Sequence, residues 1–197
     1  MSAAVAAEAM VATSQPLATR AGLRALERGG NAADAALAAA AVLSVTEPMS
    51  TGIGGDAFAL VWRDGRVEGL DAAGPAPAVA DPLPVAELGP RSVTVPGAVA
   101  GWAALAERHG RLGLDVCLVE AIGAAEDGFA VAPRTARTWT RLGGPLGRPP
   151  HAGDLVRFPE LAATLRAIAE RGPEAFYRGE TARAIASSCW LEEDDLR

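Results

Sequence analysis

The residues best suited to chemistry in this sequence lie in a glycine-rich stretch at positions 49–56. The spacing Gly52-x-Gly54-x-x-Ala57 matches a relaxed form of the dinucleotide-binding fingerprint. That fingerprint requires a strand before the glycines and a helix after them, because the helix N-terminus faces the pyrophosphate. Here a helical pattern precedes the loop and a strand-like run follows it. The reversed order excludes a dinucleotide site.

Two interpretations of this loop remain open from its residues alone. In the first, Gly52, Gly54 and Gly55 permit positive φ angles and close backbone approach, with Ser50, Thr51 and Asp56 as polar groups at the edges. In the second, the loop is a tight helix-to-strand joint without a ligand. Glycine turns are far commoner than glycine sites, which favours the joint.

The remaining titratable residues do not form a recognisable catalytic or metal-binding set. Glu47 and Asp71 could each supply half of an acid/base pair, but no partner can be assigned, and capping or turn roles are favoured. His109 and His151 are isolated in the sequence. We therefore expect no metal site and no organic cofactor.

The two cysteines, Cys117 and Cys189, are far apart and match no metal-binding or redox spacing. We expect both to be buried free thiols, because unpaired cysteine behaves as a small apolar residue.

Composition narrows the class of protein. The chain has 197 residues, a formal net charge of −6 and a hydrophobic fraction of 50%. Its basic residues are all arginines and are scattered singly, which argues against a nucleic-acid surface. Residues 1–10 contain Glu8 and no basic segment, and the alanine-rich run 35–45 is too short and too weakly apolar to span a bilayer. We expect a cytoplasmic protein with neither a nucleic-acid nor a membrane partner.

Two helices are predicted before the glycine-rich loop. The sequence Ser14-Gln15-Pro16 is typical of a helix start, and the following pattern predicts an amphipathic helix at 17–28 that ends at Gly29-Gly30. Asn31 then predicts an N-cap, with Asp34 three residues later in the first turn. The second helix, at 32–45, has no charged residue after Asp34 and is therefore expected to be buried.

The pattern after the loop predicts a β-hairpin at 57–62 and 66–70 around Asp64-Gly65. We also expect short strands at 10–13 and 92–95, an irregular segment at 71–90 and a surface loop at 142–153. Further helices are predicted at 96–109, 115–126, 133–142, 159–170 and 179–187, and the acidic run 192–195 is expected to be a solvated helix start. The result is one α+β domain over residues 1–197 with a helix-rich second half.

Six ordered segments of this chain closely resemble the γ-glutamyltransferase (glutathione hydrolase) family. The segments are 12–18 (ATSQPLA), 29–36 (GGNAADAA, with Gly29, Gly30, Asn31 and Asp34), 47–58 (EPMSTGIGGDAF, with Gly52, Gly54, Gly55 and Asp56), 92–101 (SVTVPGAVAG, with Pro96 and Gly97), 124–129 (AAEDGF) and 175–179 (AFYRG). The resemblance spans nearly the whole chain.

This resemblance implies part of an N-terminal-nucleophile hydrolase with a four-layer αββα sandwich, made as a proenzyme that cuts itself into two subunits. The new N-terminal Thr of the small subunit attacks a γ-glutamyl amide with its own α-amine as the base. In the family that Thr lies beyond the counterpart of residue 197. The resemblance thus implies an incomplete large subunit without its own catalytic residue, a C-terminal small-subunit portion as partner, and a small-molecule amide as substrate.

One departure from the family bears on the substrate. The family's segment after the hairpin reads Asp-x-Arg-Glu-x-Ala-Pro, and its Arg holds the α-carboxylate of the glutamyl group. Here Ala73 occupies the position of that Arg. The contact is lost unless another arginine, with Arg91 as the candidate, replaces it. Alternatives to a γ-glutamyl enzyme are therefore a cephalosporin-acylase-like or oxamate-amidohydrolase-like enzyme, and a truncated remnant without catalysis.

Overall fold

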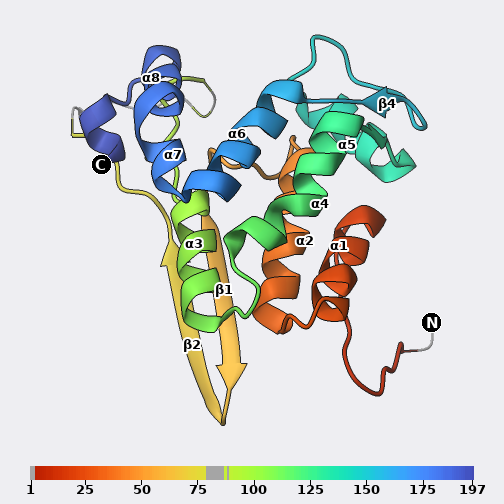
Figure 1. Cartoon of the computed structure of the whole chain (residues 1–197). Helices are drawn as coiled ribbons and strands as arrows, with labels where there is room; N and C mark the ends of the chain where they lie inside the picture. The colour runs from red at the N-terminus through yellow and green to blue at the C-terminus, as the bar shows by residue number, and fades with distance from the viewer. Residues whose placement is uncertain (1–2, 79–86, 88) are drawn as a thin grey trace.

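The computed structural model describes residues 3–78, 87 and 89–197. Its α-helices and strands in chain order are α1 (Pro16–Glu27), α2 (Ala32–Thr46), β1 (Ala57–Arg63), β2 (Arg66–Ala72), α3 (Ala98–His109), α4 (Leu114–Asp127), β3 (Phe129–Ala130), α5 (Pro133–Leu142), β4 (Leu155–Val156), α6 (Pro159–Arg171), α7 (Glu174–Tyr177) and α8 (Gly179–Ser188). A 3₁₀ helix, η1 (Glu193–Leu196), follows. This is the expected α+β fold with a helix-rich second half (Figure 1). Part of the irregular segment expected at 71–90 lies outside the described residues.

Helix α1 begins as the sequence predicts. Pro16 occupies the first turn, and the side-chain carbonyl of Gln15 accepts hydrogen bonds from the backbone N–H groups of Leu17 and Ala18. The helix ends at Glu27, and Gly29, just after the C-cap residue, has a φ of 88° that is strained for residues with a side chain. Both predicted boundaries are confirmed to within one or two residues.

Helix α2 is the buried centre of the molecule. Asn31 caps it as predicted, and Asp34 completes a capping box by accepting a hydrogen bond from the backbone N–H of Asn31. Most of the helix is buried, and α1, α3 and α4 pack around it (Figure 1). The burial of α2 confirms the sequence prediction, and its many alanines let the neighbouring helices approach closely.

The carboxylate of Asp34 is buried with 0% exposure and links α2 to the connection between α3 and α4. The two carboxylate oxygens accept hydrogen bonds from three backbone N–H groups: Asn31 at 2.8 Å, Arg111 at 3.0 Å to both oxygens, and Leu112 at 3.1 Å. The Asn31 amide adds a bond to the carbonyl of His109 at 2.6 Å. These bonds satisfy the carboxylate without an ion pair among the described residues.

Cys117 packs beside Asp34, and its Sγ donates to the Asp34 carbonyl at 3.7 Å. Burial, followed by the negative charge of Asp34, raises the pKa of the Cys117 thiol to about 12. This thiol is buried, as expected. Cys189 differs from the prediction because it is only half-buried: it follows the end of α8, where its Sγ donates to the Ile185 carbonyl at 3.3 Å.

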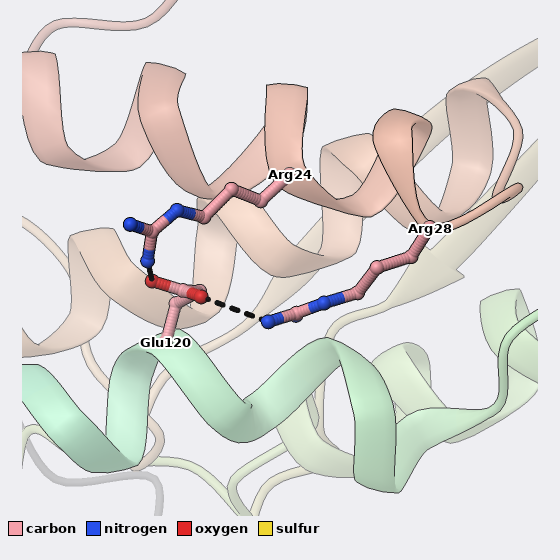
Figure 2. Close-up of polar contacts among 3 residues, drawn as sticks. All are labelled: Arg24, Arg28 and Glu120. Atoms are coloured by element: carbon pink, nitrogen blue, oxygen red, sulfur yellow. Dashed lines mark hydrogen bonds and ion pairs between the residues drawn. The ribbon is translucent and has the colours of Figure 1, made fainter.

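An ion-pair triplet joins α1 to α4 (Figure 2). Glu120 of α4 reaches between Arg24, in the last turn of α1, and Arg28, the C-cap residue of α1, with N–O distances of 2.5 Å and 3.2 Å. The two arginine side chains are 45% and 41% exposed, so we expect a modest contribution to stability.

Strands β1 and β2 form the predicted antiparallel hairpin, with Asp64 (φ 52°) and Gly65 (φ 78°) at the turn. Helix α3 packs against one face of the hairpin (Figure 1). On the other face, Phe58, Leu60 and Trp62 are 70%, 81% and 72% exposed. The hairpin therefore has one covered face and one uncovered apolar face.

The strands predicted at 10–13 and 92–95 are absent. Neither segment has a neighbouring strand among the described residues, and a β-like sequence without a ladder partner remains irregular. A β-bridge pair that sequence reasoning missed, β3 with β4, has two residues in each strand and is too short to show alternation. The later helices are confirmed, with α7 as an unpredicted additional turn. The 142–153 loop is largely exposed, as expected.

The buried carboxylate gives the first test. Replacing Asp34→Asn keeps the size but removes the charge that strengthens the three backbone hydrogen bonds, and places amide hydrogens against N–H donors. We expect a loss of about 2–3 kcal/mol in the free energy of unfolding, measured by urea denaturation.

The matched control is Asp154→Asn, because the Asp154 carboxylate accepts a similar bond from the backbone N–H of His151 at 2.8 Å but is 44% exposed. We expect a change below about 1 kcal/mol there. Equal losses in the two variants would contradict the special role of Asp34.

Candidate functional site

Three segments that are distant in sequence meet beside the hairpin. The carbonyl of Gly55, in the glycine-rich loop, accepts hydrogen bonds from the backbone N–H groups of Gly97 and Ala98, both at 2.9 Å. The Asp56 carboxylate accepts a hydrogen bond from the Gly74 N–H at 3.2 Å. The loop, the end of β2 and the first turn of α3 are thereby held together.

Close backbone approach explains two of the glycines at this junction. A Cβ atom on Gly97 would lie 2.0 Å from the Ala72 carbonyl oxygen, and one on Gly74 would lie 1.5 Å from the Val95 carbonyl oxygen. Any side chain at these positions would therefore force the backbones apart. The packing fixes the backbone on both sides of Ala73.

The glycine-rich loop itself differs from the first interpretation given above. Gly52, Gly54 and Gly55 do not have positive φ, and a Cβ on Gly52 or Gly54 would meet no described atom within 4 Å. The close approach instead occurs at Gly74 and Gly97, on the partner segments. Within the described residues the loop is a helix-to-strand joint with an open outer side.

A cavity of about 650 Å³ lies next to this junction, between β2, α3, α7 and η1. Ala73 lines the cavity and is exposed. Small residues form much of the wall, which leaves the space open along β2 and α3: Gly69, Ala72, Gly74, Gly97, Ala100, Gly101 and Ala104. A concave space of this size suits a small-molecule ligand.

Most charged side chains around the cavity already have partners. Arg178 pairs with Glu174, and Arg197 pairs with Asp194 at 2.8 Å. Asp195 accepts hydrogen bonds from the backbone N–H groups of Ala78 and Glu192, which lower the pKa of its carboxyl.

Arg108 is the exception, because it has no ion pair or side-chain hydrogen bond among the residues that the structure describes. Sequence reasoning missed Arg108. The signal was its position four residues after Ala104 and eight after Ala100, on the same stripe of α3.

Arg91, the candidate to replace the missing arginine, does not line this cavity. Its guanidinium lies over the ring of Trp190, 5.5 Å from the centroid, a distance suited to a cation–π contact. The Trp190 indole in turn donates to the Val93 carbonyl at 2.7 Å. This contact belongs to a small second core around Val95, Ala182, Leu191 and Leu196.

The other candidate carboxylates have the favoured local roles. Glu47 accepts a hydrogen bond from the Ser14 hydroxyl at 2.7 Å, and Asp71 accepts one from the backbone N–H of Ala73 at 3.0 Å. The imidazoles of His109 and His151 lie 3.6 Å from the carboxylates of Glu68 and Asp154, respectively. No cluster of metal-ligating side chains occurs among the described residues.

In the part of the chain that the structure describes, no helix is both long and apolar enough to cross a membrane.

Comparison with known proteins identifies relatives that match most of this chain. A family model described as Gamma-glutamyltranspeptidase matches residues 18–192. The chain is 36% identical to the Acylase ACY 1 proenzyme of Pseudomonas sp. (strain SE83), over 89% of this chain and 37% of that protein. It is 33% identical to the Glutathione hydrolase proenzyme of Bacillus subtilis (strain 168), over 93% of this chain and 36% of that protein.

The fold agrees with a solved member. The crystal structure of Helicobacter pylori gamma-glutamyltranspeptidase superimposes with a TM-score of 0.90 and 30% sequence identity, over 99% of this chain and 65% of that chain. The chain spans little more than a third of the length of the Acylase ACY 1 and Glutathione hydrolase proenzymes named above.

The junction gives the second test. Replacing Gly97→Ala places a methyl group against the Ala72 carbonyl, so α3 or β2 must shift. We expect a loss of about 1–3 kcal/mol in the free energy of unfolding, measured by urea denaturation.

The control is Gly123→Ala, inside α4, where an added Cβ meets nothing within 4 Å. Because alanine favours a helix, this variant is expected to gain about 0.5–1 kcal/mol. A Gly97→Ala protein as stable as the original would contradict the close contact.

Proposed function

The chain belongs to the γ-glutamyltranspeptidase family, and on that premise we propose that it contributes the first part of an N-terminal-nucleophile amidohydrolase. The enzyme would transfer or hydrolyse a γ-glutamyl amide of the glutathione type through an acyl-enzyme. The nucleophile would be the N-terminal Thr of a C-terminal portion produced by self-processing. No metal or organic cofactor takes part in this scheme.

The observation that carries this proposal is the meeting of separate motif segments beside one cavity. The glycine-rich loop, the segment around Ala73 and the first turn of α3 are joined by hydrogen bonds at Gly55 and Gly74. Position 73 is the one at which the family's arginine holds the donor carboxylate. Its exposure to the cavity supports a donor-binding role for this wall.

The uncovered face of the hairpin supports the proposed partner. Phe58, Leu60 and Trp62 form a row of large apolar side chains along β1 that no described residue buries. An exposed apolar strand face of this kind is typical of an interface. The curated relatives named above are proenzymes whose remaining length has no counterpart here. We propose that the C-terminal portion packs its own sheet on this face.

The substrate of the second candidate function is a non-glutamyl amide. Ala73 cannot form the charge-assisted contact that an arginine makes with a carboxylate, and Arg91 is engaged with Trp190. Arg108 lines the same cavity at the other end of α3. An acyl group whose negative charge lies away from position 73 could pair with Arg108. This arrangement favours an acylase, the activity named for the Acylase ACY 1 relative.

Restoring the missing arginine tests the proposal. In the protein expressed from its complete reading frame, Ala73→Arg is expected to raise kcat/KM for γ-glutamyl 4-nitroanilide by about 10- to 150-fold. The physical reason is a new bidentate contact with the donor α-carboxylate. Initial rates are measured from released 4-nitroaniline.

The matched control is Ala76→Arg, another exposed alanine in the same segment, which is expected to leave the rate unchanged. Equal gains in both variants would show a general charge effect and would contradict the role of position 73. Absence of turnover by the parent enzyme and by Ala73→Arg, with both γ-glutamyl and glutaryl 4-nitroanilide, would contradict the proposed activity.

A further inference from the structure

Tyr177 connects two parts of the molecule that are far apart in sequence. Its hydroxyl donates a hydrogen bond to the Pro96 carbonyl at 2.7 Å and accepts one from the backbone N–H of Ala100 at 3.0 Å. Tyr177 belongs to the AFYRG segment at 175–179, whose role the proposed function does not explain. The hydroxyl thus uses both its donor and an acceptor site on one helix start.

The first turn of α3 depends on this hydroxyl. The N-cap residue of α3 is Gly97, which has no side chain to accept hydrogen bonds from the first N–H groups. Tyr177 supplies the missing acceptor from α7. Tyr177 accepts a hydrogen bond from the first turn of α3, as the side chains of Gln15 and Asn31 do at the starts of α1 and α2.

The aromatic ring is held firmly enough to perform this role. Tyr177 is half-buried, and its ring meets the edge of Phe176 with centroids 5.1 Å apart at an angle of 87°. Burial raises the pKa of the Tyr177 hydroxyl, so the group remains a neutral donor well above neutral pH.

The capped turn also contacts the cavity wall around residues 72–74, which we call the donor-binding wall. Gly97 and Ala98 donate to the Gly55 carbonyl, and the Gly97 Cα packs directly against the Ala72 backbone. A shift of this turn must therefore move the segment that carries Ala73. We infer that Tyr177 is a positioning residue that fixes the donor-binding wall through the first turn of α3, an inference that rests on the proposed function.

Tyr177→Phe removes the oxygen and retains the ring, so it separates the hydrogen bonds from packing. In the 197-residue chain, we expect hydrogen exchange at residues 72–74 and 97–101 to become about tenfold faster, while α1 and α2 keep their protection. In the enzyme expressed from its complete reading frame, we expect KM for the preferred donor to rise about three- to tenfold, with kcat changed by less than about twofold.

The control is Phe158→Leu, which weakens the aromatic cluster with Phe129 and Trp139 without touching Tyr177. It is expected to lower overall stability and leave KM unchanged. Faster exchange throughout the molecule in Tyr177→Phe, or a KM equal to that of the parent enzyme, would overturn the inference. If the parent enzyme has no turnover, the proposed function fails and the local exchange pattern alone decides the place of Tyr177.

Discussion

The buried carboxylate of Asp34 joins the start of α2 to the connection between α3 and α4. It accepts backbone hydrogen bonds from the start of α2 and from the connection between α3 and α4, so it fixes three helices relative to one another. A buried charge without an ion pair is tolerable in the interior because the backbone N–H groups of Asn31, Arg111 and Leu112 donate hydrogen bonds to it. The position of α3, and with it one wall of the cavity, follows from this arrangement.

Close contacts between small residues fix the position of the hairpin relative to α3. Gly97 and Gly101 bring α3 onto β2 at Ala72, and Gly74 brings the next residues onto Val95. These contacts leave little freedom for the segment around Ala73. The opposite face of the hairpin has no such cover among the described residues, and its large apolar side chains are exposed. The two faces of the hairpin therefore differ: α3 packs on one, and the other is an uncovered apolar surface.

Local signals predicted much of this fold. Caps at Gln15 and Asn31, the turn at Asp64-Gly65 and the apolar periodicity of the later helices depend on neighbouring residues, and each was confirmed. The strands at 10–13 and 92–95 failed because a strand needs a partner that local sequence does not reveal. The candidate site was only partly predictable. Its motif segments were identified, whereas the cap from Tyr177 and the stacking of Arg91 on Trp190 depend on long-range packing.

We propose that this chain is one part of a self-processing amidohydrolase. Intact mass spectrometry of the protein purified from its native locus reports whether a longer precursor is made and cleaved. We expect two polypeptides, with the smaller one beginning at a Thr. A single polypeptide of 20.0 kDa would contradict it.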